Sequence, residues 1–204
     1  YFFHGLINHP IKHGHTHDHN ISLTGGGEKA TFRVSGAYYT QKGQTINFDM
    51  DRFTTRMALD YFVSDRITVT SDFALTYTNR TPNYENLRPT AQIIMPNMSI
   101  YAQDPQGNNT DDFYIMLQSA SSIFNNVQGY DNNQKSLINP VAMGTLAWKK
   151  EKSYNIVPQI SLDYKLLGLS HDETQLRYRG SVTMNAHTLS NSSFRPSSLT
   201  SLGM

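Results

Sequence analysis

The alternation of apolar and polar residues between His19 and Phe62 is the feature that most constrains the fold. Apolar side chains recur at every second position, a glycine-rich turn interrupts the pattern, and the alternation then resumes. A period of two residues is typical of a β-strand with one apolar and one polar face. The same rhythm runs through most of the 204 residues, so the chain is expected to build a sheet whose two faces meet different environments.

Short turns divide this pattern into strands. Residues 25–29 are expected to form a tight turn because glycine supplies positive φ at low steric cost. Two further short turns are predicted at 64–66 and 167–173, and a medium loop around 41–51. The strands are expected over 20–24, 31–39, 53–63 and 67–78, from residue 146, and over 156–166 and 175–186.

A long irregular region from about residue 79 to residue 140 separates the two groups of strands. It is rich in Asn, Gln, Ser, Asp and Pro, and a connection of this length inside a compact domain usually has a function or is mobile. A short helix is expected over 111–119, because Asp111 and Asp112 suit the first turn of a helix.

Composition excludes several classes of protein. The hydrophobic content is 38% and the mean hydropathy is −0.49, and no apolar run approaches the roughly 18 residues of a helical membrane span. A net charge of +1 gives no reason to expect nucleic-acid binding, and the absence of cysteine excludes disulfides and thiolate metal sites. Because the chain opens on Tyr1 in mid-pattern, it is expected to be a piece of something larger.

Two all-β architectures explain the alternation. In a soluble sandwich the apolar face packs inward, whereas in an outer-membrane barrel it meets lipid and the polar face meets a wet lumen. Strands of about ten residues and turns that alternate between short and long favour the barrel. Aromatic residues near the strand ends could form interfacial belts. These are Tyr38, Tyr39, Tyr61, Phe62, Tyr77, Trp148, Tyr154 and Tyr164.

The segments HNISLTGGGEKATFRVSGAYYTQKG and DRFTTRMALDYFVSDRITVTSDFALTYT carry a more specific pattern. It consists of a His-Asn pair, a strand ending in Gly-Gly, a Ser-x-x-Tyr-Tyr run followed by Gly, and an Arg-x-x-x-Arg strand. It resembles the early barrel of SusC-like TonB-dependent outer-membrane transporters, the SusC/RagA family of Bacteroidetes. The matching positions are His19, Asn20, Gly25, Gly26, Ser35, Tyr38, Tyr39, Gly43, Arg52 and Arg56, and Asn139-Pro140 and ISLDYKLLGL resemble the later strand pair.

The resemblance covers roughly residues 18–185 and implies a fold. The chain is expected to supply about seven antiparallel strands of a transmembrane β-barrel that has about 22 strands in such transporters. Residues 1–19 would be the His-rich end of an extracellular loop, 20–78 the first four strands, 79–140 a long extracellular loop, and 141–204 further strands and the start of a loop. The short turns would then be periplasmic.

The resemblance also implies a function. Such a protein imports oligosaccharides or peptides across the bacterial outer membrane, is capped by a SusD-like lipoprotein and draws energy from the TonB complex. It is not an enzyme and needs no cofactor. Aromatic residues of the long loop are expected to contact the lipoprotein or the substrate: Tyr84, Tyr101, Phe113, Tyr114, Phe124 and Tyr130.

The N-terminal histidines suggest a metal site. His13, His15 and His17 alternate along the chain, and alternate residues of an extended strand face the same way. Neutral imidazole is a good ligand for Zn, Cu or Ni, so these three side chains are the candidate ligands. The plainer interpretation is a polar loop that binds metal weakly, because nothing in the sequence fixes a second shell.

Two other classes of function stay open. One is a soluble or surface-attached β-rich binding module, such as an adhesin or lectin-like domain, which would need no detergent. The other is a passive porin, which would need neither a plug nor a TonB partner. The sequence contains no nucleophile elbow and no phosphate-binding loop, which argues against an enzyme.

Overall fold

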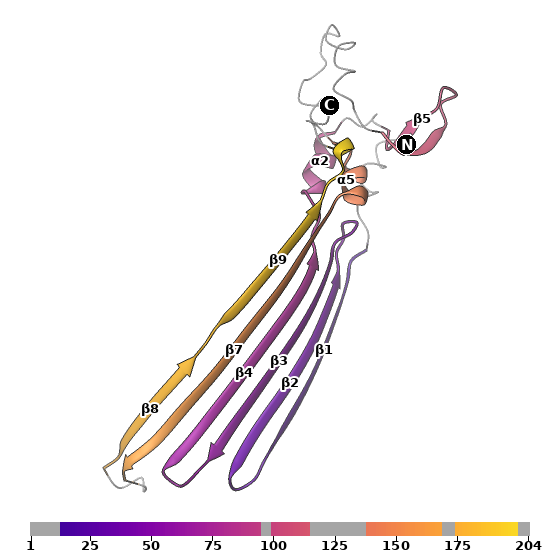
Figure 1. The fold of residues 1–204 in the computed structure, drawn as a ribbon. Coiled ribbons are helices and arrows are strands. Elements are labelled where there is room, and N and C mark those ends of the chain that lie inside the picture. The colour runs from indigo at the N-terminus through magenta and orange to yellow at the C-terminus, as the bar shows by residue number, and fades with distance from the viewer. Residues whose placement is uncertain (1–12, 95–98, 115–137, 169–173, 200–204) are drawn as a thin grey trace.

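The computed structural model describes residues 13–94, 99–114, 138–168 and 174–199, and it contains one long antiparallel sheet with a small cap at one end (Figure 1). The sheet has seven strands in the order β1-β2-β3-β4-β7-β8, with β9 also paired to β7. They are β1 (His15–Gly26), β2 (Ala30–Lys42), β3 (Asp49–Phe62), β4 (Ile67–Thr81), β7 (Trp148–Leu167), β8 (Leu176–Thr183) and β9 (Ala186–Phe194). The prediction of an all-β fold is confirmed.

The sheet is open within the described residues. β1 forms one edge, and β8 and β9 lie one after the other along β7 at the opposite edge. The short β1–β2 and β3–β4 connections lie at one end of the sheet, where β7 also ends and β8 begins, as Figure 1 shows. The longer connections and the cap lie at the other end, so the alternation of short and long connections expected from the sequence corresponds to two unlike ends of one sheet.

Three strand bounds differ from expectation. β1 begins at His15, five residues before the strand expected from Asn20, so His15, His17 and His19 are strand residues. A single strand of 20 residues, β7, replaces the two strands that were expected from residue 146 and over 156–166. The last expected strand, 175–186, corresponds to β8, and β9 was not expected beyond its first residue, Ala186.

Pro158 explains the break between β8 and β9. Its carbonyl oxygen accepts a hydrogen bond from the Met184 N–H at 3.0 Å. In an antiparallel ladder the N–H and C=O of one residue point to the same neighbouring strand, so the missing Pro158 donor also falls opposite the break. Proline inside a sheet is found at edges or irregularities for this reason.

Replacing Pro158 with valine is expected to join β8 and β9 into one strand. The new N–H can donate to the opposite strand, and one such bond contributes about 1 kcal/mol. Hydrogen exchange of the amides over residues 183–187 should therefore slow about fivefold. Ile156→Val, which leaves the backbone donors unchanged, is the control, and unchanged exchange in Pro158→Val would contradict this explanation.

The cap contains the buried core of the described residues. It is built from α2 (Leu87–Ile93), the hairpin of β5 (Tyr101–Gln103) and β6 (Asn109–Phe113), α5 (Pro140–Leu146) and the 3-10 turn η3 (Ser197–Leu199). None of the helices in the described ranges is long and apolar enough to cross a membrane. The buried apolar side chains are Ile46, Leu87, Ala91, Ile94, Val141, Ala142, Met143, Ala147 and Leu199.

The helix predicted over 111–119 is wrong at its beginning. Asp111 and Asp112 lie in β6, which pairs with β5 across a turn closed by Asp104. The Asp104 carboxylate accepts hydrogen bonds from the backbone N–H groups of Gln106 and Asn108 at 3.0 and 2.7 Å. These bonds lower the pKa of Asp104, the one from the Asn108 N–H contributing most. The polar residues that suggested a helix start therefore belong to a hairpin, and residues 115–119 lie outside the described ranges.

Candidate functional site

The strand register sorts the side chains of the sheet onto two unlike faces. Cross-strand partners share a face, so the alternating apolar residues of neighbouring strands form continuous rows. One row runs Val34–Met57–Phe73–Pro158 across β2, β3, β4 and β7. We call this side the apolar face and the other side the polar face.

The apolar face is open to its surroundings. Ile21 on β1, Ile160 on β7 and Val182 on β8 are 75%, 59% and 75% exposed. The buried apolar side chains belong to the cap, and no second layer covers this face within the described residues. A continuous exposed apolar face of this size marks a surface that meets a membrane or another protein.

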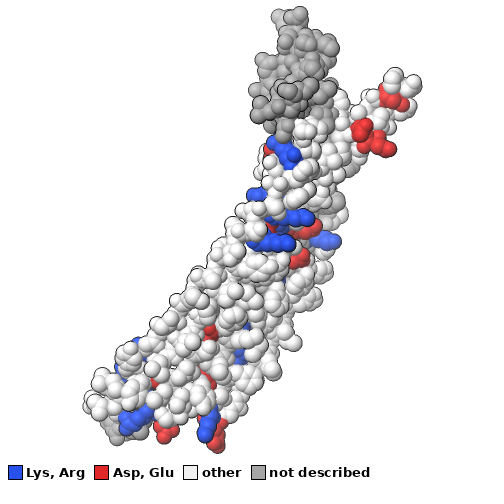
Figure 2. Space-filling view, in the orientation of Figure 1, with Lys and Arg blue, Asp and Glu red and all other residues white. Residues whose placement is uncertain are grey.

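Aromatic side chains border the apolar face at both ends. Towards the cap, Tyr38, Phe53, Tyr77 and Tyr154 are direct cross-strand partners, and the Tyr77 and Tyr154 ring centroids lie 4.7 Å apart. We call these four residues the cap-end aromatic row. Towards the short turns, Tyr61, Tyr164 and Tyr178 lie on the same face. No Asp, Glu, Lys or Arg occupies the described apolar face between the two groups. Figure 2 shows most charged side chains of the sheet gathered towards its cap end and its short-turn end, with few between them.

The height of this band matches a membrane crossing. Tyr154 and Tyr164 are ten residues apart on β7, about 33 Å at about 3.3 Å per residue. A strand tilted by about 45° would span about 23 Å of that length along the membrane normal. The apolar band of outer-membrane barrels is about 25 Å tall, so the spacing of the aromatic groups fits such a band.

The polar face carries paired charges. Asp163 on β7 accepts two hydrogen bonds from the Arg179 guanidinium on β8, the shorter at 2.8 Å. Arg56 on β3 pairs with Asp72 on β4 at 3.5 Å. Asp60 lies on the same face and accepts a bond of 2.6 Å from the Thr70 hydroxyl. The arginines of these pairs are largely exposed, and moving such charges out of water is costly, so the two faces of the sheet suit different solvents.

Asn139 joins the separate parts of the cap. Its side-chain N–H₂ group donates to the carbonyl oxygens of Ile100 and Tyr114 at 2.8 and 3.1 Å. Its side-chain oxygen accepts from the N–H groups of Val141 and Ala142 at 3.0 and 3.3 Å. With only 2% of its surface exposed, this one side chain both caps α5 and holds the base of the β5–β6 hairpin.

The loop aromatics chosen from the sequence have different surroundings. Tyr101 and Phe113 stack across the hairpin with ring centroids 5.5 Å apart, and Phe113 also packs on the cap core. Tyr84 packs on the same core beneath the Arg195 guanidinium, 5.8 Å from its ring centroid. Tyr114 is 37% exposed, so it remains free to contact a ligand or a partner. Phe124 and Tyr130 lie outside the described residues.

The candidate metal ligands lie at the start of β1. His15 and His17 point the same way, with ring centroids 5.5 Å apart, and His19 follows on the same face. Their register partners on β2 place them on the apolar face. His19 is opposite Tyr38 of the cap-end aromatic row, and His17 and His15 lie beyond that row on the cap side. Among the described residues, no group of three or more His, Cys, Asp or Glu side chains is placed to hold a metal ion. The site at His13, His15 and His17 stays a prediction.

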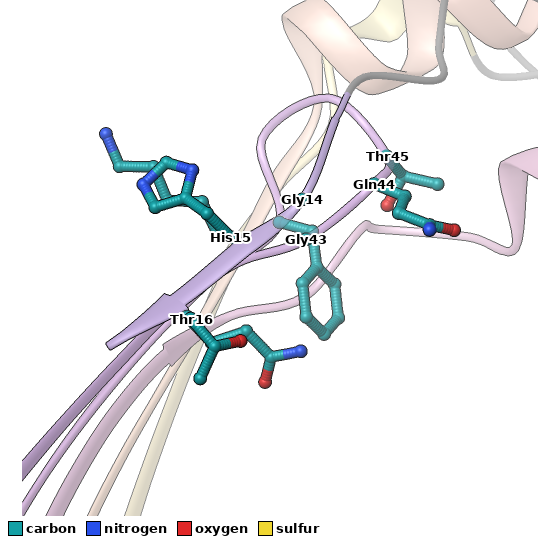
Figure 3. A pocket seen from close by; sticks show the side chains of 9 residues that line it. Gly14, His15, Thr16, Gly43, Gln44 and Thr45 are labelled. Atoms are coloured by element: carbon teal, nitrogen blue, oxygen red, sulfur yellow. The ribbon is translucent and has the colours of Figure 1, made fainter. Parts of the chain in front are cut away.

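An open pocket of about 440 Å³ lies where β1 and β2 reach the cap end. Two cross-strand pairs line it, Thr16 with Gln41 on the polar face and His15 with Lys42 on the apolar face, and Gln44, Thr45 and Phe48 of the β2–β3 loop complete it. Figure 3 shows His15 and Thr16 on opposite sides of β1. The amide and hydroxyl groups can hydrogen-bond an uncharged polar solute.

Sequence reasoning missed the cap core and the role of Asn139 within it. Core residues such as Ile46, Leu87, Met143 and Leu199 come from four distant parts of the chain, so no local period marks them. Asn139 did offer a signal, because an Asn followed by Pro is typical of a helix start.

Comparison with curated proteins indicates a distant sequence relationship. No protein-family model matches the chain. The curated "TonB-dependent receptor SusC" of Bacteroides thetaiotaomicron is 26% identical over 168 residues, which cover 81% of this chain and 16% of that protein. The chain thus spans about one sixth of the length of this relative. It is a distant homologue of a TonB-dependent receptor over most of its described sheet.

Proposed function

We propose that this chain is a segment of an outer-membrane β-barrel, with the apolar face of its sheet in lipid and the polar face lining the lumen. The observation that carries the proposal is the uncharged apolar band between two aromatic groups, left exposed on a sheet whose other face holds paired charges. This is the pattern that a barrel strand needs, since lipid cannot hydrate charge and a wet lumen can. Further strands of a longer protein would pair with the two edges of the sheet that are unpaired among the described residues.

The proposed activity is TonB-dependent import of nutrients. The distant relationship to a TonB-dependent receptor supports it. We propose oligosaccharides or peptides as the substrates and a SusD-like lipoprotein as the partner that covers the outer end. Transport through such a barrel makes or breaks no covalent bond in the substrate, so no catalytic group is assigned.

The orientation follows from this proposal. Residues 20–78 and the strands within 141–204 cross the membrane, with their short turns in the periplasm. The loop region 79–140 lies outside the cell, and so does the stretch of chain that precedes β1. The exposed ring of Tyr114 is the best-placed described contact for the lipoprotein or the substrate. Tyr84, Tyr101 and Phe113 act there mainly by packing the cap.

The predicted metal ligands fall outside the transport path in this orientation. His15 and His17 share the lipid-facing side of β1, so an ion held by them and His13 would lie at the outer rim of the barrel. We therefore propose no metal-import role for them. Isothermal titration of the purified protein with Zn²⁺, compared with a His13→Ala/His15→Ala/His17→Ala variant, measures whether they bind an ion.

The test of the proposed function is purification of the full-length protein that contains this chain. The protein is expected in outer-membrane fractions, to require detergent for extraction, and to bring a lipoprotein with it in stoichiometric amount. Recovery in the water-soluble fraction would refute the barrel. Recovery from the membrane without a lipoprotein would keep the barrel and refute the proposed partner.

A further inference from the structure

Two lysines extend from the apolar face beyond the cap-end aromatic row. On β7, exposed residues alternate with half-buried ones from Trp148 to Asn155, and Trp148, Lys150, Lys152 and Tyr154 are the exposed set. Tyr154 belongs to the aromatic row, so Lys152 and Lys150 follow it on the same side of the sheet. They lie on the cap side of the uncharged band.

These two ammonium groups lack acidic partners. Glu151, which points to the polar face, pairs with Lys149 at 2.8 Å and with Arg80 at 3.9 Å. None of the ion pairs found among the described residues includes Lys150 or Lys152. Elsewhere at this level of the apolar face, Lys42 on β2 has Asp49 on β3 as its register partner. Asp51 on β3 lies in the same cross-strand row as Lys152, but Asn79 of β4 stands between them, and the Asp51 carboxylate accepts a hydrogen bond from the Tyr38 hydroxyl at 3.2 Å. On this face, the two lysines therefore have no carboxylate as a cross-strand partner on β4 or β9.

The neighbours of the lysines are neutral hydrogen-bonding groups and aromatic rings. Lys152 has Asn79 on β4 and Ser190 on β9 as its cross-strand partners, and Lys150 has Ser192. The Lys150 ammonium lies 5.0 Å from the centroid of the Trp148 ring. Trp148 in turn stacks on Phe194 of β9, with ring centroids 6.2 Å apart. Cations, hydroxyls and an amide beside a stacked aromatic pair together suit a phosphate carried by an apolar molecule.

The depth of the lysines matches a lipid head group. Lys152 and Lys150 are two and four residues beyond Tyr154, about 7 and 13 Å along the strand. At a tilt of about 45° these lengths place the two Cα atoms about 5 and 9 Å outside the aromatic row. Aromatic belts mark the interface of the membrane, so the ammonium groups reach the layer of polar head groups.

We propose that Lys150 and Lys152, with Ser190 and Ser192, bind the phosphorylated head group of an anionic lipid, one with a net negative charge, in the outer leaflet. This inference rests on the proposed barrel, because only that orientation brings the lysines to a leaflet. The acyl chains of the bound lipid lie along the uncharged band below, and Trp148 and Phe194 shield the head group on the cap side.

The test compares lipid retention by the detergent-purified full-length protein and its variants. Native mass spectrometry measures the molecules held after titration with phosphatidylglycerol or with phosphatidylcholine. Lys150→Gln/Lys152→Gln is expected to weaken the retention of phosphatidylglycerol about tenfold and to leave phosphatidylcholine unchanged, because each basic group near an anionic surface contributes measurably. A photoactivatable phosphatidylglycerol should cross-link to the peptide that contains β9 in the wild type and lose that cross-link in the variant.

Lys149→Gln is the matched control. Lys149 is adjacent in sequence to Lys150 but points to the polar face, so this change should leave lipid retention intact. Equal losses in Lys149→Gln and the double variant, or no loss in the double variant, would overturn the lipid site. Displacement of phosphatidylglycerol by millimolar inorganic phosphate would also overturn it, because the site would then serve a free anion. These outcomes differ from failure of the barrel itself, in which the protein would not require detergent at all.

Discussion

Ile160→Arg is expected to prevent the full-length protein from accumulating in the outer membrane, whereas Gln159→Arg, one residue earlier on β7, is expected to be tolerated. Ile160 lies on the apolar face between Tyr154 and Tyr164, near the middle of the uncharged band. An arginine on the lipid side near the midplane costs about 2–4 kcal/mol. That cost is a large fraction of the usual stability of a folded domain.

The control has the same charge and nearly the same position. Gln159 points to the polar face, where its register partner is Asp72, and an arginine there meets a carboxylate and, in the proposed barrel, water. Surface expression and the heat-modifiable mobility of the folded barrel on gels measure the outcome. Equal loss in both variants would mean that β7 tolerates no large side chain on either face. Equal accumulation would remove lipid as the environment of the apolar face.

The strands could be predicted from the sequence because their side-chain period is fixed by the backbone. Alternation over 31–39 and 53–63 identified β2 and β3 to within a few residues, and the register of the two strands then places Val34 and Met57 on the same face. No second layer packs on the sheet within the described residues. The alternation of apolar and polar residues in each strand therefore depends only on which face a side chain occupies. Alternation alone did not identify the environment of the apolar face. The uncharged band and the aromatic residues at its two borders, both defined by the strand register, indicate it.

The errors arose where distant residues decide the structure. Pro158 fitted the alternation as an apolar residue, but the break that it imposes appears in the partner strand, at Met184. Asp111 and Asp112 suit the first turn of a helix, yet pairing with β5 places them in a strand. The cap core joins Ile46 to Leu199, and contacts over that separation leave no local pattern.

Asn139→Ala is expected to release the cap while leaving the sheet folded. The change removes one donor from each of the part-buried carbonyls of Ile100 and Tyr114 and the acceptor of two buried N–H groups, at a cost of about 3 kcal/mol for the cap. The Ile100 carbonyl keeps its bond from the Tyr114 N–H. The strand pairs β2–β3 and β3–β4 use none of these groups. Hydrogen exchange should therefore accelerate over 99–114 and 138–147 and stay unchanged over 49–81. The variant should also capture less of the proposed lipoprotein, because the cap is no longer held in place.

Two companion variants make the Asn139 test specific. Asn86 also precedes a helix, α2, but is exposed and its side chain makes no capping bond, so Asn86→Ala should change neither exchange nor capture. Asn139→Asp keeps an acceptor for the N–H groups of Val141 and Ala142 but loses the donor to Ile100 and Tyr114. In Asn139→Asp, amide hydrogen exchange should stay slow over α5 and accelerate at the base of the β5–β6 hairpin. If Asn139→Asp retains the hairpin, the tether is the hydrogen bond between the Tyr114 N–H and the Ile100 carbonyl, at 3.0 Å, and Asn139 serves α5 alone.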